Sequence, residues 1–214
     1  MKKLLLGIAG GIVIAAIGAG LMRYQSPDQV TRRAIEHVAS EAIQASAHLD
    51  RVQISAADGT GLVTGFTVGN PAGFKTAAAL TADSIKLTVE LSTLDKGAIV
   101  VRTLWLASPR ITYEENQAGS NFTALLENIR RGAADKRAEP GKKIVVDRLV
   151  IHGAKLSYAS RAGQTITVDL PDIGLNNIGR TQGGATSSEF ATAIVEVLLY
   201  HAKRNIPAGA LQHR

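Results

Sequence analysis

From Asp50 onward, apolar residues tend to recur at every second position. The most regular run is 84–92, where Ile85, Leu87, Val89 and Leu91 alternate with polar or charged residues. A period of two puts alternate side chains on opposite faces of a β-strand, so one face of this strand is apolar and the other is wet. The alternation predicts a half-solvated antiparallel sheet and a mainly β domain with some α-helix.

Less regular runs of the same kind predict further strands, separated by Gly, Pro, Asn and Asp residues that favour turns. They cover 52–56, 61–68, 99–107, 110–115, 143–152, 155–160, 165–170 and the less certain run 173–177. The domain is therefore expected to contain eight or nine strands.

Three segments have helical patterns instead. Ser26 as N-cap and Pro27 at the first helical position predict an amphipathic helix that ends near Ala47. Residues 121–129 predict a short helix that covers the sheet. A capping box at 186–189 predicts a C-terminal helix that ends near residues 205–207.

The nineteen residues from Leu4 to Met22 carry no charge. A helix of that length spans about 28 Å, close to the thickness of the hydrocarbon layer of a membrane, so we expect a single transmembrane helix. A cleaved signal peptide is the alternative, because two lysines precede the segment and small residues end it. Gly7, Gly11 and Ala15 form a stripe on which another helix could pack, although such residues are also common in membrane helices.

These patterns divide the chain into four parts: a transmembrane anchor at 1–23, an amphipathic linker helix at 24–48, a β domain at 49–180, and a C-terminal helix and tail at 181–214. Positive charges flank the apolar segment almost equally, so charge alone leaves its orientation open. A short N-terminal tail before a long folded part favours a location of the domain outside the cytoplasm.

Residues 99–113 and 144–158 align without gaps at a spacing of forty-five residues, with five identical positions. Each copy reads as a strand, a bend and a second strand, which predicts a hairpin used twice in one sheet. Chance similarity between two β-rich segments is the alternative.

The sequence contains no recognisable catalytic, metal-binding or cofactor-binding motif. It has no cysteine, and its five histidines have no metal-ligand spacing. The net charge is +6, but aromatic residues make up only 4% of the chain, which argues against a nucleic-acid partner. We therefore expect a protein that is not an enzyme and has no cofactor.

The order of several motifs resembles the AsmA-like family of bacterial envelope proteins. The motifs are Val68-Gly69-Asn70-Pro71-Ala72-Gly73-Phe74, Leu91-Ser92-Thr93-Leu94, Ile99-Val100-Val101, Pro109-Arg110-Ile111-Thr112-Tyr113-Glu114, Ser120-Asn121-Phe122 and 149–158. The resemblance covers roughly residues 1–180. It implies a single-pass protein of the bacterial inner membrane, with a curved antiparallel sheet in the periplasm that forms a groove or half-barrel with short flanking helices.

The resemblance also implies lipid handling, lipid transport or maintenance of the outer envelope, with phospholipid as a partner. In that case Ile85, Leu87, Val89 and Leu91 are the candidate apolar groove. The alternative is a structural or assembly subunit that contacts other envelope proteins, or itself, through its transmembrane helix. The Asn70-Pro71 segment also resembles the LEA-type β-sandwich, another module without enzymatic activity.

Overall fold

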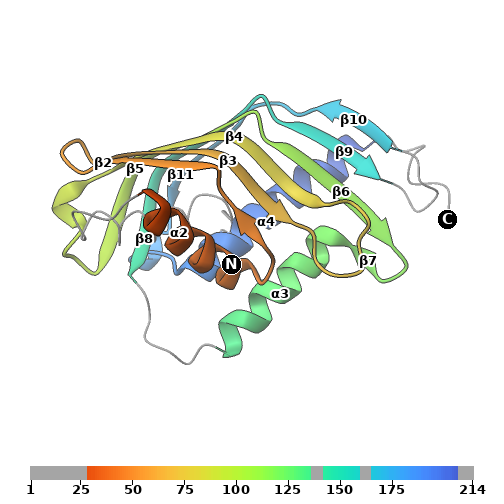
Figure 1. The fold of residues 1–214 in the computed structure, drawn as a ribbon, viewed down its shortest axis with the longest axis horizontal. Coiled ribbons are helices and arrows are strands. Elements are labelled where there is room, and N and C mark those ends of the chain that lie inside the picture. The colour runs from red at the N-terminus through yellow and green to blue at the C-terminus, as the bar shows by residue number, and fades with distance from the viewer. Residues whose placement is uncertain (1–27, 136–141, 160–164, 207–214) are drawn as a thin grey trace.

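The computed structural model describes residues 28–135, 142–159 and 165–206, in which one sheet arches over three helices (Figure 1). The helices are α2 (Asp28–Ile43), α3 (Asn121–Asp135) and α4 (Ser187–Asn205), and two 3-10 turns are η1 (Leu91–Thr93) and η2 (Arg180–Gln182). The strands are β1 (Ala47–His48), β2 (Arg51–Ser55), β3 (Thr60–Gly69), β4 (Ala78–Val89), β5 (Ala98–Ala107), β6 (Arg110–Asn116), β7 (Gly119–Ser120), β8 (Lys143–His152), β9 (Lys155–Ala159), β10 (Thr165–Asp169) and β11 (Ile173–Ile178).

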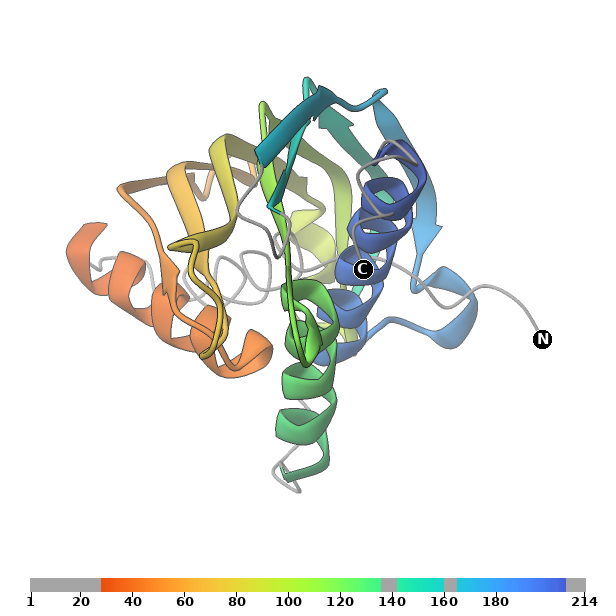
Figure 2. The same ribbon diagram turned by 90° about the vertical axis from the view of Figure 1, so that its right-hand side faces the viewer.

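The predicted fold class is wrong. Within the described ranges, no helix is long and apolar enough to cross a membrane, and residues 1–23, predicted to do so, lie outside those ranges. The sheet is mixed rather than antiparallel, because β5 pairs with β8, and β6 with β9, in parallel. The helices have 15 to 19 residues and pack beneath the arch instead of flanking an open groove (Figure 2).

Several strands continue one another across a bend. β5 and β6 both run antiparallel to β4, so the chain keeps its direction through Ser108 and Pro109. β8 and β9 run parallel to β5 and β6, and β11 and β10 lie antiparallel to β8 and β9. The hairpin predicted for each repeat copy is therefore wrong, and each copy is one long bent strand.

The two copies lie side by side with the offset that their sequences share. Leu104 is the ladder partner of Leu149, and Tyr113 is the partner of Tyr158, both at a separation of forty-five residues. The two tyrosine rings stack with their centroids 5.9 Å apart. Like residues therefore meet across the parallel ladder, and this arrangement explains the repeat better than chance similarity does.

A parallel pair of neighbouring strands needs a crossover connection, and α3 provides it. The helix follows β6 and β7, and β8 begins after it. Phe122, Leu125 and Ile129 recur at helical spacing and are at most 1% exposed. Their burial holds α3 against the inner face of the sheet.

The other two helices complete the inner layer. The predicted capping box of α4 is confirmed, since Thr186 and Glu189 exchange side-chain and backbone hydrogen bonds. Phe190, Ile194 and Leu198 then face the core. In α2, Ile35, Ala39 and Ile43 are fully buried, whereas its predicted N-cap, Ser26, lies outside the described ranges. One apolar core thus joins the sheet to all three helices.

A line of outward-facing residues, which we call the crease, crosses every long strand. At each crossing two consecutive residues leave the core, with a buried residue directly before and after them. The pairs are Asp50-Arg51, Thr64-Gly65, Asp83-Ser84, Ala107-Ser108, His152-Gly153 and Pro171-Asp172. Because strand side chains alternate, this additional outward residue moves the apolar positions from odd to even numbers, or the reverse, along each strand. The inner face thereby stays apolar on both sides of the bend.

Equivalent residues of the two repeat copies make the bend. Ser108 and Gly153 are forty-five residues apart and both have positive φ, 48° and 64°. The ladder continues around them, because the Ser108 amide donates to the His152 carbonyl and the Lys155 amide donates to the Pro109 carbonyl. A left-handed conformation suits glycine and strains serine.

A buried polar network attaches the loop between β3 and β4 to β6 and α3. The Asn121 side chain, fully buried, donates to the Asn70 side chain and to the Thr112 carbonyl, and accepts from the Glu114 amide. Asn70 in turn donates to both oxygens of Thr76. Three residues of the AsmA-like motifs, Asn70, Glu114 and Asn121, are thus joined in one structural network.

Glu114 is 5% exposed, and its carboxylate accepts hydrogen bonds from the Lys75 amide and from the amide and hydroxyl of Thr76. Burial raises the pKa of this carboxyl, but these hydrogen bonds outweigh burial and hold the pKa below its ordinary value of 4.5. The folded state therefore stabilises the ionised form of the Glu114 carboxyl more than the unfolded chain does.

We predict opposite effects of exchanging the two bend residues. Ser108→Gly should raise the free energy of unfolding by up to about 1 kcal/mol, because it relieves a left-handed serine. Gly153→Ser should lower it by about 1–2 kcal/mol. The site has room for the new Cβ, whose nearest neighbour would be the Ser108 hydroxyl at 3.7 Å. Urea denaturation measures both free energies of unfolding. Equal effects of the two substitutions would contradict the left-handed backbone conformation at Ser108 and Gly153.

We also predict that Glu114 makes stability depend on acid pH. Its contribution is present above the pKa of the unfolded chain and is lost as the pH falls through the lower pKa of the folded state. Glu114→Gln should lower the free energy of unfolding at neutral pH by about 1–3 kcal/mol and flatten its acid dependence. The control is Glu127→Gln, an exposed residue of α3. A wild-type acid dependence that survives in Glu114→Gln would exclude this role.

Candidate functional site

The predicted apolar groove residues lie mainly in the core. Ile85, Leu87 and Val89 of β4 are 0%, 3% and 3% exposed, and they belong to the cluster that includes the helix side chains. Only Leu91, in η1, reaches the surface, at 38% exposure. This apolar face is therefore part of a closed core and does not line an open groove. The stripe of Gly7, Gly11 and Ala15 lies outside the described ranges.

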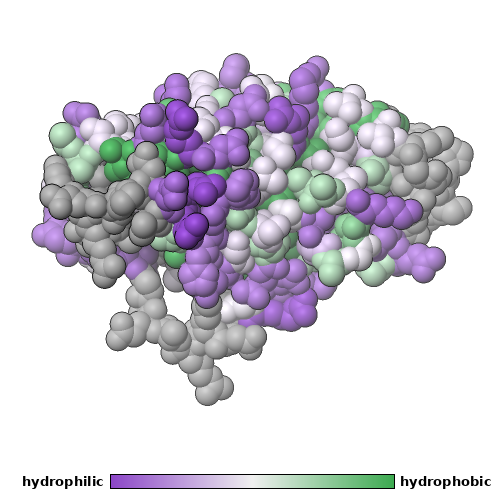
Figure 3. Space-filling model, viewed as in Figure 1, coloured by the Kyte–Doolittle hydropathy of each residue, from purple (hydrophilic) through white to green (hydrophobic). Residues whose placement is uncertain are grey.

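The opposite face of the sheet is the outer face of the arch, where polar residues alternate with the buried ones. Threonine and serine are frequent there, for example at Thr60, Thr88 and Thr103. In the view of Figure 3, polar and charged residues spread over the surface, and apolar residues occur in small separate areas. Among the described residues, the exposed large apolar side chains are Leu91, Trp105 and Tyr200, so one in the middle of the outer face is an exception.

Trp105 is that exception. It is 38% exposed on β5, its side chain points outward between Leu104 and Leu106, and its ring lies 5.6 Å from that of His152. Its ladder neighbours are Lys86 on β4 and Val150 on β8. We define the Trp105 patch as Leu62, Lys86, Trp105, Arg148 and Val150, which occupy adjacent outward positions of four strands.

Two features leave the patch open. Lys86 and Arg148 are exposed, and neither has an ion-pair partner within the ranges that the structure describes. Beyond Val150 lies Gly174 of edge strand β11, where a Cβ would meet nothing within 4 Å. Leu62 and Val150 are half-buried, so they add apolar surface on either side.

Several other cations of the outer face are paired, although the exposed Arg51 on the crease has no ion pair among the described residues. Arg110 contacts Asp83 at 3.0 Å, Lys155 contacts Asp169 at 2.6 Å, and Arg102 binds both Glu90 and Asp147. Such exposed pairs neutralise charge and add little stability. What distinguishes the Trp105 patch is that two unpaired cations lie beside an exposed aromatic ring.

The hydroxyl group of Tyr113, whose pKa is shifted far from its ordinary value, belongs to the core rather than to a reactive site. Tyr113 and Tyr158 both donate to the Glu115 carboxylate at 3.2 Å. Burial, together with the Glu115 charge, raises the pKa of Tyr113 to about 12 despite a hydrogen bond with Ser120. A hydroxyl with that pKa is a poor proton donor near neutrality. Within the described ranges, no group of three or more His, Asp or Glu side chains is arranged to hold a metal ion.

His152 pairs with Asp172 on the outer face, with 2.7 Å between the Nδ1 and carboxylate atoms. The hydrogen bond from His152, with another from the Gly153 amide, holds the pKa of Asp172 below its ordinary value. This pair connects β8 to the turn before β11 at the crease beside Trp105.

Comparison with known proteins does not assign the chain to a family. No protein-family model and no curated protein matches the chain. The AsmA-like resemblance and the division into four parts therefore stay predictions. Trp105, at the centre of the patch, carries a signal in the sequence that none of the motifs above includes: it is a tryptophan at a polar-face position of an alternating strand.

We predict that the two faces of the sheet respond differently to truncation. Leu87→Ala should lower the free energy of unfolding by about 2–5 kcal/mol, because it leaves a cavity in a closed core. Trp105→Ala should cost less, about 1–2 kcal/mol, because the ring is partly in water and its loss leaves no closed cavity. Denaturation of the two variants tests this. A Leu87→Ala effect as small as that of Trp105→Ala would favour an open groove on the inner face.

Proposed function

We propose that the protein is a non-enzymatic module of the bacterial cell envelope that binds the surface of an anionic phospholipid membrane through the Trp105 patch. The observation that carries this proposal is an exposed tryptophan beside Lys86 and Arg148, two cations without ion-pair partners in the described part of the chain. The proposal keeps the expected phospholipid partner but places it on the outer face of the sheet.

The chemistry of the patch suits the boundary between water and lipid. Tryptophan is enriched at that boundary, because its ring is largely apolar and its indole N–H can stay hydrated. Each lysine or arginine near an anionic membrane surface contributes about 1 kcal/mol of attraction. Half-buried Leu62 and Val150 extend the apolar contact without exposing a large hydrophobic area.

Features outside the patch support the same setting. The net charge of +6 favours anionic surfaces, and the segment from Leu4 to Met22 is uncharged. The AsmA-like motifs support a location at the inner membrane with the domain in the periplasm.

The chain contains a single tryptophan, so its fluorescence reports directly on the patch. The full-length protein would be reconstituted into phosphatidylcholine vesicles with and without phosphatidylglycerol. With the anionic lipid, emission of Trp105 should shift to shorter wavelength and be quenched by brominated lipid. High salt should reverse both effects, because the Debye length falls to about 3 Å at 1 M salt.

The double variant Lys86→Gln/Arg148→Gln should weaken docking of the patch by about thirtyfold, since it removes two attractions of about 1 kcal/mol each. Lys155→Gln is the matched control, because it removes one charge from a residue already paired with Asp169. If Trp105 stays fully accessible to the aqueous quencher acrylamide in anionic vesicles, the patch does not contact lipid. A defined protein cross-link at Trp105 would then favour the assembly role.

A further inference from the structure

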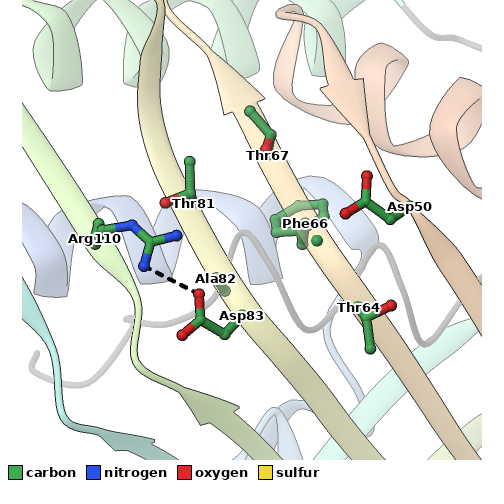
Figure 4. A pocket seen from close by; sticks show the side chains of 9 residues that line it. Asp50, Thr64, Phe66, Thr67, Thr81, Ala82, Asp83 and Arg110 are labelled. Atoms are coloured by element: carbon green, nitrogen blue, oxygen red, sulfur yellow. Dashed lines mark ion pairs between the residues drawn. The ribbon is translucent and has the colours of Figure 1, made fainter.

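The outer face has a hollow of about 410 Å³ on the crease, separate from the Trp105 patch (Figure 4). It lies over β3 and β4, with β6 on one side and the connection from β1 to β2 on the other. The lining residues are Asp50, Thr64, Gly65, Phe66, Thr67, Thr81, Ala82, Asp83 and Arg110. Nothing in the core or in the proposed membrane contact uses this site.

Gly65 shapes the hollow. Its φ is +65°, and a Cβ at this position would lie 1.8 Å from an oxygen of the Asp50 carboxylate. A side chain is therefore excluded both by the backbone conformation and by the space that Asp50 occupies. The carboxylate of Asp50 lies over bare backbone of β3 as a result, which turns a flat sheet surface into a recess with an acidic wall.

The opposite wall carries both signs of charge. Arg110 Nη1 lies 3.0 Å from Asp83 Oδ1, the ion pair drawn in Figure 4. A guanidinium has five N–H donors, so Arg110 can bind a second acceptor while it keeps Asp83. With two carboxylates and one guanidinium, the lining has a net charge of −1.

Asp50 is the less compensated of the two carboxylates. The nearest cationic group given to it by the structure is His48 Nε2 at 3.7 Å, and the other nitrogen of that ring is closer to Glu36, at 2.8 Å. His48 is thus shared between two carboxylates, and it lies beyond hydrogen-bond distance of Asp50. Asp50 can therefore accept a cation at the acidic wall.

Hydroxyl groups lie between the two walls. Thr64 and Thr67 line the hollow on β3, and Thr81 lines it on β4. The Thr81 hydroxyl oxygen is buried and lacks a hydrogen-bond partner among the described residues. Because this oxygen is shielded from solvent, hydroxyl contacts to a ligand would come from the half-buried Thr64 and Thr67.

We propose that the crease hollow binds a zwitterionic group in which a primary ammonium lies close to a phosphate. The ammonium would face Asp50, the phosphate would contact Arg110, and threonine hydroxyls would complete the contacts. A quaternary ammonium fits less well, because such ions are recognised by aromatic faces and the only aromatic lining residue, Phe66, is 0% exposed. The same chemistry occurs in free phosphoethanolamine and in the head group of phosphatidylethanolamine.

The test titrates the full-length protein, in detergent micelles, with phosphoethanolamine, phosphocholine and ethanolamine, and follows amide NMR signals. Phosphoethanolamine should shift the signals of Thr64, Gly65 and Thr67 and should bind about tenfold more tightly than phosphocholine, which lacks ammonium N–H donors. Equal affinity for the two compounds, or shifts that spare these residues, would overturn the proposal.

Variants separate the two walls. Asp50→Asn should weaken phosphoethanolamine binding by at least about fivefold, whereas Asp95→Asn, an exposed residue in the turn before β5, should not change it. Arg110→Gln should weaken phosphoethanolamine but not ethanolamine. Asp50 is exposed, so Asp50→Asn should stay folded, which circular dichroism would verify. Unchanged affinity in both hollow variants would exclude the site.

Vesicles then identify the source of the ligand. Vesicles that contain phosphatidylethanolamine should displace phosphoethanolamine if the hollow binds a lipid head group; lack of displacement would assign the hollow to the free compound. Asp50→Asn should leave the Trp105 emission shift in anionic vesicles unchanged. A negative result for phosphoethanolamine binding in the hollow can thus be distinguished from a negative result for membrane binding by the Trp105 patch.

Discussion

The in-register parallel pairing of the two repeat copies is the constraint on which the rest of the structure depends. Parallel neighbours cannot be joined by a tight turn, so the chain has to cross from β6 to β8, and α3 lies in that crossing. The crossover helix then needs a partner layer, which α2 and α4 complete beneath the arch. The same register aligns Ser108 with Gly153, so the bends of the two long strands coincide instead of breaking the ladder.

Local sequence patterns predicted elements well but not their connections. The alternation of Ile85, Leu87 and Val89 identified the C-terminal half of β4, and the capping box at Thr186 identified the start of α4. The N-terminal half of β4 was missed, because the crease at Asp83-Ser84 reverses the alternation there. The sequence predicts a chain-reversing turn at Ser108-Pro109, because short connections with a proline commonly reverse a chain. Whether the chain reverses there depends on which strands pair with β5 and β6, and those pairings join residues far apart in the sequence.

The candidate site was harder to predict for a physical reason. Periodicity tells which side chains of a strand share a face, but whether that face is covered depends on residues far away in the sequence. Leu87 has the same pattern in an open groove as in a closed core, and the helices of this chain close it. Trp105 and the crease hollow are defined by strands that are adjacent only after folding, so Lys86 and Arg148, or Asp50 and Arg110, show no relation in the sequence.

The ladder between the copies has one further consequence. Because Leu104 faces Leu149 and Tyr113 faces Tyr158, each copy is the packing environment of the other. A larger side chain in one copy is accommodated most easily by a smaller one forty-five positions away, so the two segments are expected to diverge by paired exchanges rather than independently. Their shared residues then reflect a geometric dependence between neighbouring strands that is maintained by contact.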